Sequence, residues 1–542
     1  MRAIFAAVAV TCAFAWGAAA WAQTPQPQDP AAARVQVSEF VVTGNDLLPE
    51  AQLQQVLAPF KGERTLAELK QAAQAVQDLY SQAGFGAVIA YLPEQTDTAG
   101  RVTIAVLEGR IVRVVVSGNK QYTEGNIRAS LPLLKEGLTP QVQKIDAEIQ
   151  LANENASKQV AVSLEPGAAQ GEVIATVSVQ ELPASRWTLS ADNTGNASTG
   201  RTRVSLGYAN AALWDLDHSV SLQYQTSPEK PSRVEVLSGS YRIPLYSIGA
   251  ALEAFAAHSN VDGGTSTTAA GPLQFSGRGN VMGLRFTDYL MRRGELDQRL
   301  IFGVDQREYL NNCAITGLPD GACGSAGASV TVHPVSIEYT AQTGGARNGG
   351  PAAGFNISVA RNLNVGGRFG AASDFDAVRA GAKPNYTAWR SGLFGSQPLP
   401  GDWQLQARAN GQWSDTALVQ GEQFGIGGAA SVRGYEEREI VGDSGYVGSF
   451  ELYSPDFAAR LGAAASTARV LAFVDGGHVW NELGLPCRDG QTRCTLASVG
   501  MGLRLGSNAW QLHADVARAA KAAAQTRSGD YRLHFQAGYS FN

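Results

Sequence analysis

Single apolar and single polar residues alternate in many short segments of the chain after Arg186. Such alternation is typical of β-strands whose two faces meet different surroundings. The final segment shows it most clearly, because every second residue from Tyr531 to Phe541 is aromatic or aliphatic. At roughly 22 residues per strand and connection, residues 186–542 hold about sixteen strands, the even number that single-chain bacterial barrels require. We therefore predict a mainly β fold for this range.

The segments that connect these strands alternate in length. The short connections lie at 210–217, 243–248, 292–295, 397–402 and 506–508, and the long ones at 260–275, 311–329, 362–383, 423–445 and 478–495. A soluble β-sandwich would give the same alternation within its strands. Aromatic residues near strand ends, with short turns on one side and long loops on the other, favour a transmembrane antiparallel β-barrel over residues 186–542.

One pattern occurs twice before this region. VSEFVVTGN at 37–45 and IVRVVVSGN at 111–119 each predict a strand that ends in a Gly-Asn turn. In each copy two helices and two strands follow, with helices expected at 49–59, 66–83, 124–131 and 140–157, and strands at 87–92, 102–106, 159–164 and 172–179. A repeat of about 75 residues in β-α-α-β-β order predicts one small α+β domain used twice, at 35–108 and 109–182.

The first residues indicate export. Residues 1–22 combine Arg2, an apolar run and a small-x-small cleavage site, so we expect a signal peptide and, at 23–34, a flexible leader rich in Pro and Gln. No later apolar run reaches the roughly 18 residues of a spanning helix. The net charge of -5 gives little support to nucleic-acid binding.

Four cysteines remain after the predicted signal peptide, in two close pairs. Cys313 with Cys323 and Cys487 with Cys494 each enclose a short segment that contains Gly and Asp. We predict two local disulfides in long external loops, with free thiols as the alternative. Zinc sites need closer spacings, so no metal is expected. The histidines that could act as ligands are scattered, at His218, His333, His478, His513 and His534.

The main candidate site is the long Gly-rich segment at 423–445, QFGIGGAASVRGYEEREIVGDSG. Loops of this length are usually functional or disordered, and glycines permit close approach of the backbone to other groups. Val432, Arg433, Gly434 and Tyr435 place a cation at its tip. The charged residues that follow are interpreted as a solvated rim: Glu436, Glu437, Arg438 and Glu439.

A second candidate segment, FVDGG, lies on a predicted strand after this loop. It contains Phe473, Asp475 and Gly476. Asp475 shares a strand face with Phe473 and lies opposite Val470 and Val474. If the valine face meets lipid or core, Asp475 points to the other side.

These motifs, taken in order, resemble two-partner secretion outer-membrane transporters of the TpsB type, the haemolysin and adhesin exporters of the POTRA-plus-barrel superfamily. The resemblance covers nearly all of the chain after the signal peptide. It lies in Tyr80, Gly84-Phe85, YLPEQ at 91–95 and LEG at 107–109 in the first repeat, and in SADNTG at 190–195, TGR at 199–201, VRGY and FVDGG in the barrel region.

The resemblance implies two periplasmic POTRA domains, at 35–108 and 109–182, before a sixteen-stranded barrel in the bacterial outer membrane. It also implies that segment 423–445 folds into the lumen and that Arg433 pairs with Asp475. Removing one partner of such a buried pair costs roughly 3–5 kcal/mol. The alternative for Arg433 is a solvated charge in an external loop.

The implied function is a porin-like pore that exports a large, unfolded, β-helical exoprotein, recognised through the POTRA domains by strand addition. No nucleotide-binding loop is present, so we expect export without ATP and without a cofactor. We further expect a monomer or weak dimer in contact with outer-membrane lipid. Because about twelve residues precede the first repeat, too few for a plug helix, we predict that segment 423–445 chiefly closes the pore.

Two other functions are considered. Relatives that assemble other barrel proteins usually carry three or more POTRA domains, and two copies favour secretion. A serine protease is suggested by Gly442-Asp443-Ser444-Gly445 and by His258, but Tyr446 follows where that fold has Gly, and His258 ends a predicted barrel strand. We therefore expect no enzyme.

Overall fold

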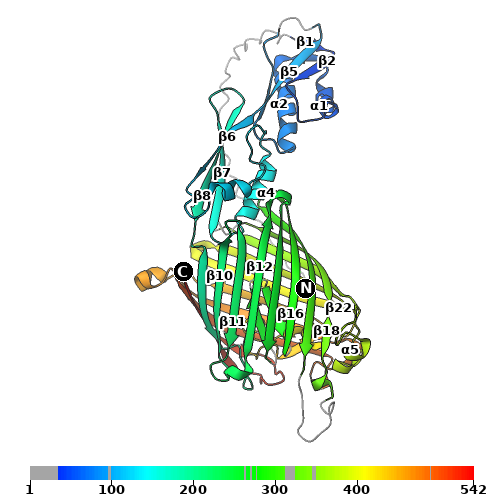
Figure 1. Ribbon diagram of the computed structural model, residues 1–542, viewed down its shortest axis with the longest axis vertical. Coiled ribbons are helices and arrows are strands. Elements are labelled where there is room, and N and C mark those ends of the chain that lie inside the picture. Colours follow the sequence, from blue (N-terminus) through cyan, green and yellow to red (C-terminus); the bar gives the residue numbers. More distant parts are fainter. Residues whose placement is uncertain are drawn as a thin grey trace, which may run out of the picture. The chain divides into compact units, whose positions relative to one another are not determined.

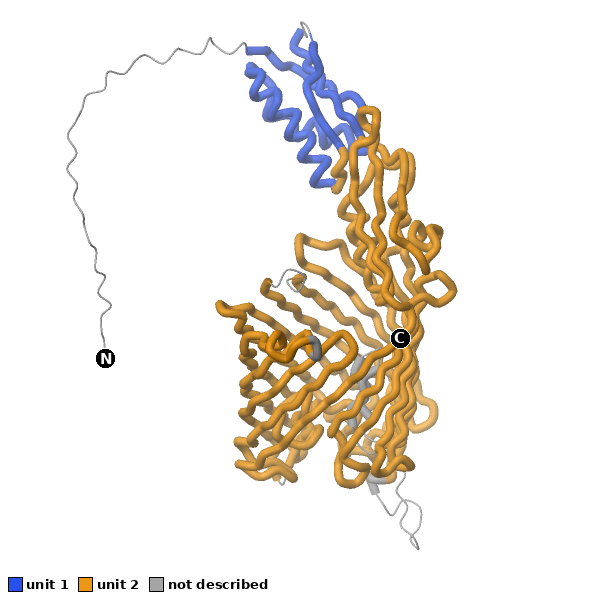
Figure 2. The backbone as a smooth tube through the Cα atoms, turned by 90° about the vertical axis from the view of Figure 1, so that its left-hand side faces the viewer, with its two compact units in different colours: residues 1–83, 88–108 blue, residues 84–87, 109–542 orange. Residues whose placement is uncertain are grey.

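The computed structural model describes residues 34–95, 99–261, 264–268, 271–275, 278–311, 324–344, 350–488 and 490–542. The predicted signal peptide, nearly all of the predicted leader, and Cys313 and Cys323 lie outside these ranges. The chain forms two compact units, residues 1–83 with 88–108 and residues 84–87 with 109–542 (Figure 2). In the described ranges, no helix is both long and apolar enough to cross a membrane.

The first unit contains the first repeat as a three-stranded sheet with two helices. The sheet has the order β2 (Glu39–Thr43), β5 (Arg101–Glu108), β4 (Val88–Tyr91), and the helices are α1 (Glu50–Leu57) and α2 (Leu66–Gln82). Thr65 and Glu68 form a capping box that begins α2. One pair of strands was not predicted, β1 (Arg34–Val37) with β3 (Gly62–Thr65).

The second repeat, residues 109–182, has the same arrangement within the second unit. Its sheet has the order β6 (Arg110–Ser117), β8 (Glu172–Glu181), β7 (Lys158–Pro166), and its helices are α3 (Glu124–Ala129) and α4 (Val142–Ala152). All four predicted helices are present. Two of them, α2 and α3, begin at the predicted residue, and every other helix end lies one to five residues inside the predicted range.

The Gly-Asn turns of the two repeats are equivalent in conformation. Gly44 has φ +77° and Gly118 has φ +88°, both in the left-handed region. A Cβ atom would lie 2.2 Å from the carbonyl oxygen of Val106 at Gly44 and 2.3 Å from that of Val179 at Gly118. Only glycine fits both turns, which explains why the sequence repeats this residue.

Most of the remaining strands close into a sixteen-stranded antiparallel barrel, as predicted, with β18 and β19 sharing one position (Figure 1). The strands are β9 (Ser185–Asp192), β10 (Arg203–Leu213), β11 (His218–Thr226), β12 (Glu235–Leu245), β13 (Ala250–Asn260), β16 (Arg278–Arg293), β17 (Leu296–Leu310), β18 (Val330–Val332), β19 (Pro334–Thr343), β20 (Ala352–Asn362), β21 (Thr387–Leu399), β22 (Trp403–Ser414), β25 (Ser444–Tyr453), β26 (Thr467–Trp480), β27 (Arg493–Gly506), β28 (Trp510–Ala519) and β29 (Tyr531–Phe541). Outside the barrel, β14 (Gly264–Thr268) pairs with β15 (Gly271–Phe275), and α5 (Ala372–Val378) lies in the connection before β21.

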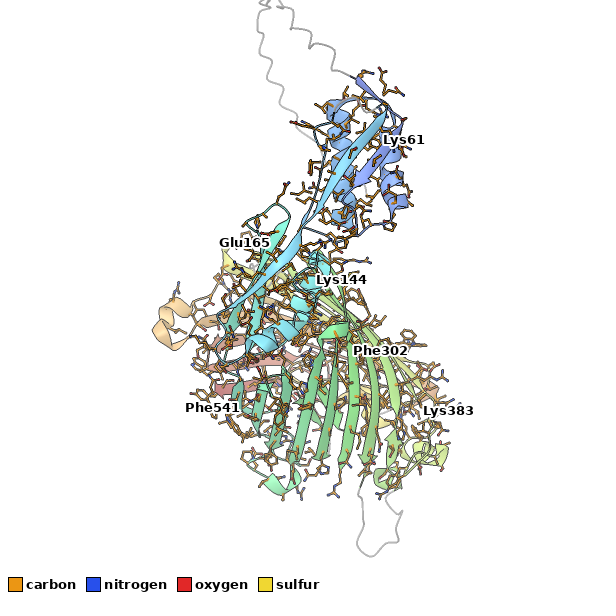
Figure 3. The ribbon with its side chains drawn as sticks, turned by 45° about the horizontal axis from the view of Figure 1, so that its top comes forward. Lys61, Lys144, Glu165, Phe302, Lys383 and Phe541 are labelled. Carbon is orange, nitrogen blue, oxygen red and sulfur yellow. A yellow bond between two sulfur atoms is a disulfide. The ribbon has the colours of Figure 1, made fainter. Side chains whose placement is uncertain are left out.

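The barrel exposes its apolar face and encloses its polar face. Phe302 and Phe541, labelled in Figure 3, are 41% and 43% exposed on strands of the wall. Within β26, Val470 and Val474 are exposed whereas Phe473 and Asp475 are buried, as the alternation predicted. An apolar exterior around a polar interior suits a wall that stands in lipid.

Candidate functional site

Segment 423–445, here called the inner loop, is a packed element inside the barrel. Its ends pair as two short strands, β23 (Phe424–Ile426) with β24 (Ile440–Gly442). Ile426, Val432 and Tyr435 are fully buried in a core that includes Val479 of β26 and Leu496 of β27. Apolar burial of this kind stabilises one position of the loop within the lumen.

The guanidinium of Arg433 is bound by several groups of the barrel wall and is 1% exposed. Its Nε and Nη2 atoms each donate to one carboxylate oxygen of Asp475, both at 2.8 Å. Nη2 also lies 2.7 Å from Glu451 Oε1 and 3.0 Å from Ser449 Oγ. The guanidinium carbon is 3.4 Å from the centroid of the Phe473 ring. This two-pronged geometry, with a stacked ring, is specific to arginine.

The residues beside Arg433 extend this contact to the last strands. Gly434 has φ +95°, and its N–H donates to Nε2 of His534 on β29 at 2.9 Å. The Tyr435 hydroxyl lies 2.8 Å from the carbonyl oxygens of Ala497 and Lys521. The tip of the inner loop therefore contacts the wall from β25 to β29.

The close approach at FVDGG depends on a different glycine from the one singled out in the sequence. A Cβ added to Gly476 would meet no atom within 4 Å. A Cβ added to Gly477 would lie 3.2 Å from methyl groups of both Ile426 and Val432. Gly477, not Gly476, leaves the space that the inner loop fills.

Glu422 directly precedes the inner loop and anchors its base to the barrel wall. The sequence did not predict this role. The Glu422 carboxylate is 2% exposed and lies 2.9 Å from Arg307, 3.1 Å from Arg390 and 2.8 Å from the Tyr309 hydroxyl. These partners come from β17 and β21. Gln412 of β22 also donates to the Glu422 carbonyl oxygen at 2.9 Å.

Asp443 fixes the other end of the base. It is fully buried and binds Arg379, whose Nη2 lies 3.1 Å away. The backbone N–H groups of Leu418 and Glu482 also donate to it, each at 2.9 Å. Together with Glu422, Asp443 anchors the base at β17, β21, β22 and the neighbouring long connections, whereas the tip is anchored at β25–β29. The inner loop therefore crosses the lumen.

The interpretation of residues 436–439 as a solvated rim is wrong. Glu439 accepts hydrogen bonds from the N–H groups of Gln525 and Thr526, both at 2.7 Å. Glu437 accepts one from Ala429 N–H at 2.6 Å. These charges bind backbone groups because the loop folds back into the barrel, where they are partly buried instead of standing in open solvent.

A cavity of about 950 Å³, lined by many charged and polar residues, remains in the lumen beside the inner loop. Its lining mixes charges of both signs, among them Arg186, Asp192, Arg408, Glu451, Arg504 and Asp515. The lumen is thus only partly filled, and the space left is suited to water and polar chain rather than to an apolar ligand.

The other sequence predictions are placed as follows. Cys487, in the connection between β26 and β27, forms a disulfide with Cys494, the second residue of β27. Ser444 on β25 and His258 on β13 lie on strands that are not neighbours in the barrel. The Ser444 hydroxyl bonds Ser414 and the His258 ring bonds Asn280. Among the described residues, no group of three or more potential metal ligands comes together.

Comparison with known proteins gives consistent matches. The family model of the haemolysin secretion/activation proteins ShlB/FhaC/HecB matches residues 171–505, and that of the ShlB-type POTRA domain matches residues 35–109. The outer membrane transporter CdiB of Dickeya dadantii (strain 3937) is 23% identical over 450 residues, which are 82% of this chain and 75% of that protein.

Solved structures share the fold. CdiB from Escherichia coli superimposes with a TM-score of 0.76 at 19% identity, covering 95% of this chain and 93% of that one. BamA from Haemophilus ducreyi lacking POTRA domains 1–3 gives a TM-score of 0.50 at 16% identity, covering 93% and 100%.

Proposed function

Because this chain belongs to the ShlB/FhaC/HecB family of two-partner secretion transporters, we propose that it exports a large, unfolded, β-helical exoprotein across the outer membrane. The observation that carries the proposal is a closed barrel with an apolar exterior and a polar lumen, crossed by a loop fixed at both walls by charged groups. Such a loop closes a pore and can be released without breaking covalent bonds.

The proposed orientation follows from the ends of the barrel. The second repeat hydrogen-bonds to the short turns, for example from Thr123 to Asp215 at 2.5 Å. In the proposal, these turns and both POTRA domains, at 35–108 and 109–182, lie in the periplasm. The long connections, including the Cys487–Cys494 disulfide, then lie outside the cell, where disulfides persist.

Capture of the client is proposed to occur by strand addition to the first repeat. Strand β4 forms an edge of its sheet, since within the described part of the chain it pairs with β5 and no other strand. Ile89 and Tyr91 on this edge are 54% and 42% exposed. An unfolded segment can therefore pair with this edge and cover apolar side chains at one place. Folding of the exported chain outside the cell supplies the driving force, without ATP.

A deletion strain tests the proposal. Cells that lack this chain should accumulate its partner exoprotein in the periplasm, and reintroduction of the chain should restore exoprotein at the cell surface. The levels of other outer-membrane barrels should not change. A general loss of those barrels would instead support an assembly factor, the function that a BamA-like fold also allows.

A further inference from the structure

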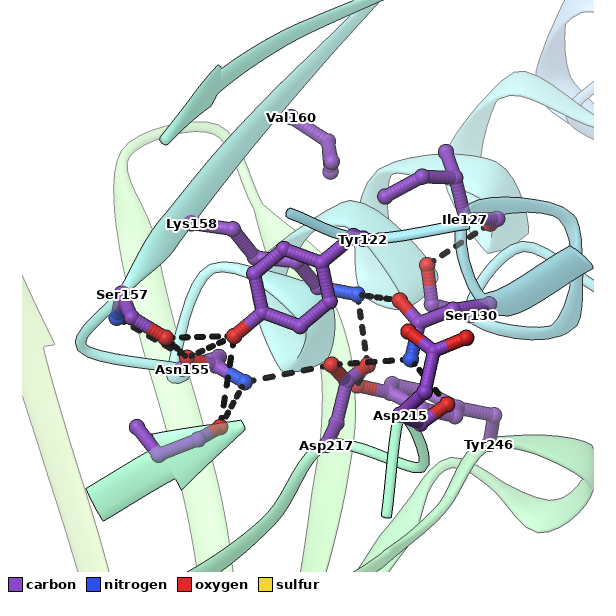
Figure 4. Close-up of polar contacts among 12 residues, drawn as sticks. Tyr122, Ile127, Ser130, Asn155, Ser157, Lys158, Val160, Asp215, Asp217 and Tyr246 are labelled. Atoms are coloured by element: carbon purple, nitrogen blue, oxygen red, sulfur yellow. Dashed lines mark hydrogen bonds and ion pairs between the residues drawn. The ribbon is translucent and has the colours of Figure 1, made fainter. Parts of the chain in front are cut away.

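A fully buried lysine joins the second repeat to the barrel. Lys158, the first residue of β7, is 0% exposed, and its Nζ lies 2.5 Å from Asp217 Oδ2 (Figure 4). Nζ also donates to Asn126 Oδ1 at 2.7 Å. Asp217 belongs to the turn between β10 and β11. Lys158 and Asp217 therefore form an ion pair between the second repeat and the barrel, shielded from water.

Both carboxylate oxygens of Asp217 accept further hydrogen bonds, from the second repeat and from the barrel. Asn126 and Asn155 of the second repeat each donate to Oδ1 at 3.2 Å. Tyr246, in the turn between β12 and β13, donates to Oδ2 at 2.6 Å. A buried charge is tolerated only when it is paired and hydrogen-bonded in this way. Displacement of the second repeat would break the ion pair and leave Lys158 with only Asn126 and Asp217 with only Tyr246 as hydrogen-bond partners among the described residues.

The turn that carries Asp217 has an uncommon backbone. Trp214, Asp215 and Asp217 have φ values of +63°, +54° and +60°, although none is glycine. Backbone of this kind persists where surrounding contacts determine it, often at functional sites. Here Asp215 accepts from Thr123 and Asp217 from Lys158, whereas Trp214 is 74% exposed. The turn directs its two acids into the second repeat.

Other contacts at this boundary are weaker or less specific. Arg299 of β17 binds Glu154 through two hydrogen bonds of 3.2 and 2.6 Å, but both side chains are about one quarter exposed. Leu151 packs against Ala251 and Tyr289. Apolar packing and solvated ion pairs allow small shifts, whereas the Lys158 network has one arrangement that satisfies every partner.

We propose that Lys158 is a positioning residue for export, because it locks the second repeat onto the 214–217 turn in a single arrangement above the lumen. This inference rests on the proposed function: a client that passes along the second repeat is then delivered to one fixed point of the barrel rim. Lys158 touches no client group in this role and acts through the orientation of the repeat.

The test compares Lys158→Met with Lys144→Met in the full-length protein. Lys144 is an exposed lysine of α4 (Figure 3), so the same substitution there removes a charge without touching the network. In Lys158→Met we expect the hydrogen-exchange rate of residues 122–130 and 211–217 to rise at least tenfold and export to fall at least tenfold. The barrel should stay folded, as judged by its heat-dependent migration in gel electrophoresis. Lys144→Met should change neither. If Lys158→Met prevents folding, Asp217→Asn, which keeps the hydrogen-bond acceptor, replaces it.

A cross-link separates positioning from a merely structural role. Cysteines at positions 154 and 299, joined by a short bis-maleimide in the Lys158→Met protein, should restore export. Export that stays normal in Lys158→Met, unchanged exchange, or a cross-link that restores protection but not export would each overturn the inference. If the unaltered chain exports nothing, the proposed function fails, and the exchange comparison still decides whether Lys158 locks the repeat.

Discussion

Arg433 at the tip of the inner loop donates to both carboxylate oxygens of Asp475, 42 residues further along the chain. We expect Arg433→Ala to abolish export while the barrel remains assembled, because loss of one partner from a buried pair destabilises the seated loop by roughly 3–5 kcal/mol. Arg433→Lys keeps the charge but not the two-pronged geometry, so its export should be intermediate. Surface exoprotein and heat-modified migration measure the two effects. Normal export by Arg433→Ala would contradict the assigned role.

The second prediction concerns closure of the pore. Deleting residues 423–445 should raise the conductance of the purified protein in planar bilayers severalfold. Arg433→Ala alone should give only brief openings, because Glu422 and Asp443 still hold the base. Adding both Glu422→Gln and Asp443→Asn to Arg433→Ala should bring the conductance close to that of the deletion.

The control for this experiment is Lys383→Ala, which removes an exposed charge from a long connection. It should conduct as the unaltered protein does. A deletion variant with unchanged conductance would show that the inner loop does not close the lumen.

A third prediction is a pH dependence within the second repeat. Burial raises the pKa of Glu148 to about 7, although Leu133 N–H donates to it at 3.0 Å. Because this value lies above the ordinary 4.5, the stabilising contribution is complete below about pH 4.5 and is lost as the pH rises through about 7. Hydrogen exchange of residues 131–134 and of α4 should therefore be several-fold faster at pH 8 than at pH 5.5, after correction for intrinsic rates. Glu148→Gln should remove the difference, and Glu165→Gln, at an exposed site, should keep it.

The fourth prediction uses two glycines of the second repeat that differ in their surroundings. Gly118→Ala forces a methyl group to within 2.3 Å of Val179 O, whereas Gly137, with φ +86°, has no atom within 4 Å of an added Cβ. Gly137→Ala should lower the free energy of unfolding by about 1–2 kcal/mol, because only the left-handed backbone is unfavourable for alanine. Gly118→Ala should cost clearly more. Urea-dependent proteolysis of the second repeat compares the two variants, and equal losses would show that the clash is relieved by movement of the turn.

Much of the fold could be predicted from periodicity, because strand alternation depends only on which face meets lipid. The parity of Asp475 with Phe473 placed it inside the barrel, and the equivalent turns at Gly44 and Gly118 marked the repeat. The pairing of Arg433 with Asp475 came from family resemblance, since alternation alone cannot say which loop enters a lumen.

The missed residues depend on tertiary contacts between distant segments. Glu422 resembles any loop acid, and Asp443 was considered only as part of a protease-like motif, until β17, β21 and the long connections are placed around them. Lys158 did leave a signal, because it shares a strand face with Val160, which is buried. A charge on an apolar face indicates a buried partner, and the sequence WDLD at 214–217 offered two.

Three acids of the wall surround Arg433 at the tip of the inner loop, and two other arginines lie beside them. When Arg433 leaves, Glu451, Asp475 and Asp515 stay on the wall, with Arg408 3.6 Å from Glu451 and Arg504 2.8 Å from Asp515. Asp475 is then left with the Ser449 hydroxyl at 2.6 Å and no cation of its own among the described residues. With Arg433 out of its site, the channel should therefore favour small cations over anions. A shift of the reversal potential in a salt gradient towards cation selectivity would show that the guanidinium has left.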